Sequence, residues 1–188
     1  MLLLAACSSP SDQLRKTFNT VNNSLLRASY AASQQKYQAY YHLVQDQRDT
    51  NALVAAKADS LYSVTEKALK YMEQLKLQLS AMDSVGDKTR PAEQLLLHTL
   101  TSDSLRTDLL DVSRYAYDGL IGKEKITSLD SELQGIHTIT GQKDWTGMYF
   151  RRASTEWTLA LLSITQINCL HAATITFSSM AHVKTPVF

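Results

Sequence analysis

The stretch WTLALLSITQINCLHAATITFSSMAHV, from Trp157 to Val183, contains no Asp, Glu, Lys or Arg. A helix this poor in charge usually lies at the centre of a domain, where neighbouring helices cover most of its sides. Its length would also suit a membrane span. Because Gln166, Asn168 and His171 lie in the middle and make insertion costly, the sequence favours a buried bundle helix over a span.

The length and composition of the chain indicate its domain size, its charge and the helix lengths that it permits. A chain of 188 residues is long enough for one domain with a sizeable core. With 19 Lys+Arg against 18 Asp+Glu, the net charge of +1 gives no electrostatic footprint for nucleic acid. Only three prolines and six glycines are present, so long helices can run without interruption.

The amino-terminal residues resemble the end of a bacterial lipoprotein signal, in which Leu4-Ala5-Ala6 precede the lipid-carrying Cys7. This interpretation divides the chain into a truncated signal remnant (1–6), a tether (7–11) and one helical domain (12–188). Acyl chains on Cys7 would hold the protein to a bilayer. Only six residues precede the cysteine, fewer than the charged and apolar regions of a full signal need. The alternatives are therefore a start codon assigned too late or a chance match at a short apolar tip.

A first long helix is predicted from Asp12 to about Val44, with apolar residues at spacings of three and four. The residues at these spacings are Phe18, Val21, Leu25, Ala28 and Ala32. The same helix carries Tyr30, Tyr37 and Tyr41 on one shared face. Such a face either packs as a seam with its hydroxyls reaching water or lines a groove for a sugar or peptide.

The most regular pattern follows a polar turn at 45–51, and its alternating spacings of four and three predict a seam of an antiparallel bundle. The seam residues are Val54, Ala58, Leu61, Thr65, Ala68, Met72, Leu75 and Leu79. A loop is predicted at 84–91, one or two short helices between Ala92 and Glu132, and a third long helix from about Ser102 to Leu120. Residues 136–145 are rich in Gly and Thr, which predicts a loop or a short strand. The expected fold is all-α, an up-down bundle of four long helices with one or two short connecting helices.

Motifs for catalysis and metal binding are not found in the sequence. A di-metal bundle needs Glu-x-x-His pairs, and none occurs. Phosphate-binding, dinucleotide-binding and nucleophile-elbow glycine motifs are likewise missing. Cys169 and His171 are two residues apart and point in opposite directions on a helix, so Cys169 is predicted to be a small buried residue. Asn168 and His171 are spaced to form a buried polar pair. We expect no enzyme activity, no metal and no cofactor.

The final helix and the segment before it contain Trp145, Phe150, Leu162 within Ala160–Ser163, and the sequence Gln166-Ile167-Asn168. In these residues the chain resembles the amino-terminal D1 domain of the GldM/PorM family, periplasmic components of type IX secretion and gliding motility in Bacteroidetes. Upstream, residues 58–61 and 70–76 resemble the second long helix of the family. The chain departs from the family in three ways. It has a lipobox in place of a transmembrane helix, lacks charges after Asn168, and has no β-rich domains within its 188 residues. It is therefore interpreted as a paralogue or as the first part of a longer protein.

The resemblance implies a non-catalytic assembly protein of the cell envelope, on the periplasmic side, with homodimerisation and secretion or gliding components as its expected interactions. Membrane contact would be through the lipid anchor only, and Ser8-Ser9 after the cysteine favour the outer membrane. The alternative hypothesis is a periplasmic ligand-binding helical module in which Tyr30, Tyr37 and Tyr41 line a groove. A third hypothesis, an enzyme, requires titratable groups that converge only in the folded chain.

Overall fold

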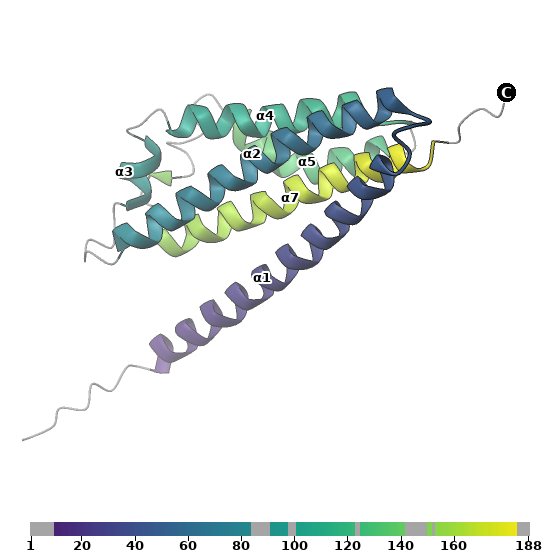
Figure 1. Ribbon diagram of the computed structural model, residues 1–188. Coiled ribbons are helices and arrows are strands. Elements are labelled where there is room, and N and C mark those ends of the chain that lie inside the picture. Colours follow the sequence, from purple (N-terminus) through teal and green to yellow (C-terminus); the bar gives the residue numbers. More distant parts are fainter. Residues whose placement is uncertain are drawn as a thin grey trace, which may run out of the picture.

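The computed structural model describes residues 10–83, 91–97, 101–122, 125–141, 150–151 and 153–183. All regular structure in this part of the chain is α-helical, which confirms the predicted all-α class. The helices are α1 (Pro10–Gln45), α2 (Ala52–Asp83), α3 (Pro91–Leu97), α4 (Thr101–Gly119), α5 (Ile126–Thr140) and α7 (Thr155–Ala181). Figure 1 shows α2 running back against the direction of α1, with α4 and α7 running opposite to α2.

Helix α7 is the central helix, as its lack of charge predicts. It packs against α1, α2, α4 and α5, which approach it from different sides. The Ser154 hydroxyl caps its amino end by accepting a hydrogen bond from the backbone N–H of Trp157. Among the described helices, α7 alone is long and apolar enough to cross a membrane. Its contacts with all five other described helices identify it as a core helix of this fold.

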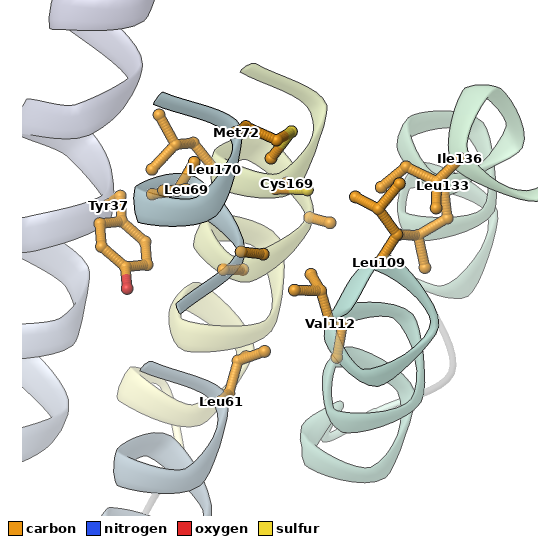
Figure 2. Packing of buried hydrophobic residues seen from close by; sticks show 14 of the residues in the cluster. Tyr37, Leu61, Leu69, Met72, Leu109, Val112, Leu133, Ile136, Cys169 and Leu170 are labelled. Atoms are coloured by element: carbon orange, nitrogen blue, oxygen red, sulfur yellow. The ribbon is translucent and has the colours of Figure 1, made fainter. Parts of the chain in front are cut away.

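The seam predicted on α2 is confirmed. Ala58, Leu61, Thr65 and Met72 are each 0% exposed, and Leu75 and Leu79 continue the same buried line. Figure 2 shows Leu61, Leu69 and Met72 of α2 beside Cys169 and Leu170 of α7, with α4 and α5 on the other side. A strict alternation of four and three keeps one face of a long helix against its partners, so α2 stays in the core along most of its length.

The end of α4 lies unusually close to α7. A Cβ atom added to Gly119 would come within 2.6 Å of Met180 Cε and 2.9 Å of Thr176 Cγ2. The Thr176 hydroxyl donates a 3.0 Å hydrogen bond to the carbonyl of Ala116 at the same contact. Beyond the helix end, Gly122 has a φ of 86°, which favours glycine. Gly119 therefore permits the close approach of α4 to α7, and Gly122 permits the turn that follows.

The prediction of a loop from residue 136 is wrong for its first part, because α5 continues to Thr140. Ile136 is fully buried, and the Thr140 hydroxyl donates a 2.8 Å hydrogen bond to the carbonyl of Ile136. Burial of Leu129, Leu133 and Ile136 along one face stabilises a helix that the local Gly and Thr content disfavours. At fifteen residues, α5 is longer than the short connecting helix expected here.

Helix α1 packs against α7 mainly through its carboxyl-terminal half, and its other half diverges from the rest (Figure 1). The buried line on α1 runs through Ser33, Tyr37 and Val44. The predicted apolar stripe lies elsewhere: Val21 is 52% exposed and Leu25 is 64% exposed. Ala28 and Ala32 are exposed as well. We call these four residues the outer face of α1.

Candidate functional site

Two of the three tyrosines predicted to share a face of α1 are packed. The Tyr37 ring is 0% exposed and stacks on Tyr62 of α2, with 5.4 Å between ring centroids and 7° between planes. Phe177 of α7 lies 5.5 Å from the same ring. Tyr41 also stacks on Tyr62, at 4.1 Å, and its ring is half-buried. These rings join α1 to α2 and α7, so Tyr37 and Tyr41 form a seam.

The Tyr41 hydroxyl belongs to a polar cluster between α1 and α2. It donates a 2.9 Å hydrogen bond to Asp59, whose other carboxylate oxygen lies 2.7 Å from the Arg48 guanidinium. Burial and the Asp59 acceptor raise the pKa of Tyr41 to about 12. Desolvation opposes ionisation of Asp59, but hydrogen bonds from Arg48, Tyr41 and Gln45 outweigh it and leave the carboxyl pKa below its usual value. The cluster stabilises the turn between the two helices.

Tyr30, the third tyrosine, borders a cleft where α1 diverges from α2 and α7. The cleft has a volume of about 560 Å³, within the range of small-molecule sites. Burial raises the Tyr30 pKa, with Glu66 and Glu73 adding to the effect. The cleft has a mixed lining, with charged side chains from α1 and α2 and one leucine from each of the three helices. Of the tyrosine face, only Tyr30 lines this cleft.

Gln166 of α7 forms the polar floor of this cleft and is 1% exposed. Its amide nitrogen donates to the carbonyl of Leu69 at 3.2 Å, and its amide oxygen accepts from the Lys76 ammonium at 3.0 Å. Lys76 also donates to Glu73 at 2.9 Å, and this hydrogen bond lowers the Glu73 pKa. These hydrogen bonds hold Gln166, Lys76 and Glu73 in fixed positions.

A cluster that the sequence does not reveal joins three helices at His171. The Ser33 hydroxyl of α1 lies 2.8 Å from His171 Nε2, and Glu132 Oε2 of α5 lies 3.2 Å from His171 Nδ1. The predicted pairing of His171 with Asn168 is replaced by these contacts, and Asn168 lies against Gly135 of α5. Ser33 and His171 are separated by 138 residues, so no local spacing signals their contact.

A serine, a histidine and a carboxylate in hydrogen-bonded sequence resemble the triad of a serine hydrolase, but the position of Ser33 in the fold differs from that of a catalytic serine. Ser33 lies in the middle of α1 and is only 4% exposed. Backbone N–H groups inside a helix are bonded to carbonyls of the preceding turn, so they cannot form an oxyanion hole beside Ser33. The cluster therefore connects α1 to α5 and α7 near the point where α1 diverges, and we assign it a structural role.

Cys169 is a buried free thiol, as its position predicts. Burial raises the pKa of the Cys169 thiol to about 12, so the reactive thiolate is suppressed. In the described part of the chain, no group of three or more His, Cys, Asp or Glu side chains is placed to hold a metal ion.

The described residues of the final segment that carry the family resemblance lie just before α7 and along its first half. Phe150 is buried and meets Trp157 edge-on at 6.5 Å, while Leu162 and Gln166 are buried and Asn168 is half-buried. Trp145 and Cys7 lie outside the described residues. Comparison of the sequence with protein-family models and with curated proteins finds no match.

Proposed function

We propose that this chain is a non-catalytic interaction protein of the cell envelope that associates through the outer face of α1. The observation that carries this proposal is a stripe of apolar residues, spaced like a coiled-coil seam, that no other described helix covers. We interpret the long helices as an up-down bundle, with the amino-terminal half of α1 extending from it as the docking element. Secretion or gliding components remain the proposed partners, on the basis of the family resemblance.

A second copy of α1 fits this outer face. Alternating spacings of four and three allow two identical helices to interlock side by side. Ala28 and Ala32 are small and permit close approach of the helices. Asn22, Ser24 and Ser29, which flank the stripe, carry no charge that would oppose pairing of identical helices. A parallel pair would also direct both Cys7 anchors toward one membrane surface.

Sedimentation of the full chain tests this proposal, with Cys7→Ser used to remove lipid attachment. We expect a dimer that Leu25→Glu converts to a monomer, because a carboxylate at the centre of the seam loses its hydration. Leu53→Glu is the matched control, because Leu53 of α2 is 73% exposed and lies far from the outer face. A chain that is monomeric at all concentrations, or a dimer that tolerates Leu25→Glu, contradicts homodimerisation through α1.

Affinity capture from native membranes tests the envelope assignment. The lipid-anchored chain is expected to fractionate with membranes and to recover secretion or gliding components, whereas Cys7→Ser should release it. If the Leu25→Glu chain still recovers these components, the partner binds to another surface. Soluble behaviour of the unsubstituted chain would contradict the anchor.

The cleft beside Tyr30 supports a second candidate function, a ligand-binding helical module. Its volume and its fixed polar floor are features of small-molecule sites. Saturable binding of a small molecule that Leu77→Ser weakens would support this function. Binding unaffected by Leu77→Ser would place the ligand elsewhere.

A further inference from the structure

We propose that the cleft between α1, α2 and α7 binds a single-chain amphipathic carboxylate, with its anionic head at Arg27 and Lys76 and its alkyl chain on the leucines. This inference rests on the second candidate function and specifies its ligand. It does not depend on dimerisation, because Leu26 lines the cleft whereas its neighbour Leu25 lies on the outer face, about 100° around the helix.

The charges of the cleft favour an anion. Among the residues that the structure describes, Arg27 and Lys76 line the cleft together with one carboxylate, Glu73. Glu73 already accepts the 2.9 Å hydrogen bond from Lys76. Arg27 forms no ion pair with another described residue, so its guanidinium can bind an incoming carboxylate through two hydrogen bonds. The described part of the lining therefore carries one positive charge in excess, on Arg27, which has no partner within it.

The remaining lining favours an alkyl chain. Leu26, Leu77 and Leu159 reach the cleft from three different helices, and Leu77 is 64% exposed. Covering these side chains with an alkyl chain removes apolar surface from water, which favours binding. Tyr30 adds a ring face beside them. A volume of about 560 Å³ suits one chain with its head group.

Lys76 needs no rearrangement to receive the head group. Its ammonium has three donors, and two of them are used by Glu73 and Gln166. Gln166 is itself fixed by the Leu69 carbonyl, so the ammonium is held at one position on the cleft floor. A ligand therefore meets a preorganised cation, and little ordering of side chains opposes binding.

Calorimetric titration of the full chain with sodium dodecanoate, below its micelle concentration, tests the proposal. We expect saturable binding of one dodecanoate per chain and no saturable binding of dodecylammonium, which has the same chain and the opposite charge. Arg27→Gln should weaken dodecanoate binding about tenfold or more, since it removes a charge-assisted contact. Lys70→Gln is the matched control, because it removes one exposed cation from α2 outside the cleft and should leave the affinity unchanged.

Several results would overturn the proposal. Equal binding of dodecylammonium would show that charge is not recognised, and equal effects of Arg27→Gln and Lys70→Gln would show that the head group lies elsewhere. Co-sedimentation with anionic phospholipid vesicles without binding of monomeric dodecanoate would indicate a bilayer surface as the partner. If dodecylammonium saturates the chain and Leu77→Ser weakens it, the ligand-binding module stands and only its proposed ligand class fails.

Discussion

Truncation of Tyr37 to alanine would test whether α1 is docked on α7 as described. The ring is fully buried, stacks on Tyr62 and meets Phe177 at a tilt, so its removal opens a cavity between three helices. Loss of a large aromatic side chain from a core costs about 3–5 kcal/mol in free energy of unfolding. Tyr37→Phe should cost about 1 kcal/mol or less, because the hydroxyl donates only a long hydrogen bond of 3.4 Å to the Tyr62 carbonyl.

Urea unfolding followed by circular dichroism measures both effects, with Leu25→Ala as the control on the other side of the same helix. Because Leu25 is exposed, its truncation should change the unfolding free energy of the monomer by about 0.5 kcal/mol or less. Measurements at several protein concentrations separate this value from any contribution of dimerisation. If Tyr37→Ala lowers the free energy of unfolding by less than about 1.5 kcal/mol, then α1 is not docked on α7 through the face that carries Tyr37.

Three further outcomes follow from the ionisable groups. In a Cys7→Ser chain, Cys169 should fail to react with a thiol reagent until the protein unfolds, because burial raises its pKa to about 12; reaction of the native chain at the rate of free cysteine would contradict this. Burial and hydrogen bonding raise the pKa of Tyr41 to about 12. The stabilisation that the neutral Tyr41 phenol provides is therefore complete below pH about 10 and is lost as the pH rises toward 12. Ultraviolet titration of Tyr41→Phe should lack one late-ionising phenol. The hydrogen bond from Lys76 lowers the pKa of Glu73 in the folded protein. The stabilisation that ionised Glu73 provides is therefore complete above the carboxyl pKa of the unfolded chain, about 4.3, and is lost as the pH falls through the lower pKa of the folded protein. Glu73→Gln should reduce the acid dependence of unfolding, and an unchanged pH profile would argue against the ion pair.

The sequence predicts the α2 seam well and the orientation of α1 poorly. On α2 one apolar line dominates, and it is the line that the other helices bury. On α1 two lines compete, one through Val21 and Leu25 and the other through Tyr37 and Val44. Periodicity shows that each line is compatible with a helix but does not identify which one faces the core. The structure buries the tyrosine line because Tyr62 and Phe177 are placed to receive its rings.

The candidate sites depend on contacts between distant parts of the chain. The position of Tyr30 on its helix face predicts that it lines a groove. Gln166 and Lys76 line the same cleft only because α7 and α2 lie together in the fold. The Ser33–His171 pair has no sequence signal at all. In α5, burial outweighs local preference, so Ile136 lies in a helix where glycine and threonine content indicates a loop. Such tertiary effects cannot be obtained from spacing within one segment.

The divergence of α1 has a geometric consequence. From Pro10 to Ser33 the helix rises about 35 Å at 1.5 Å per residue, and at Ser33 the contact with His171 joins it to α7. With the anchor proposed at Cys7, this segment acts as a rigid stand-off that sets the height of the bundle above the lipid surface. Each inserted residue would lift the bundle by about 1.5 Å and turn it by about 100°. With that proposed anchor, the length of α1 would fix both the distance of the bundle from the lipid surface and the direction in which the bundle faces.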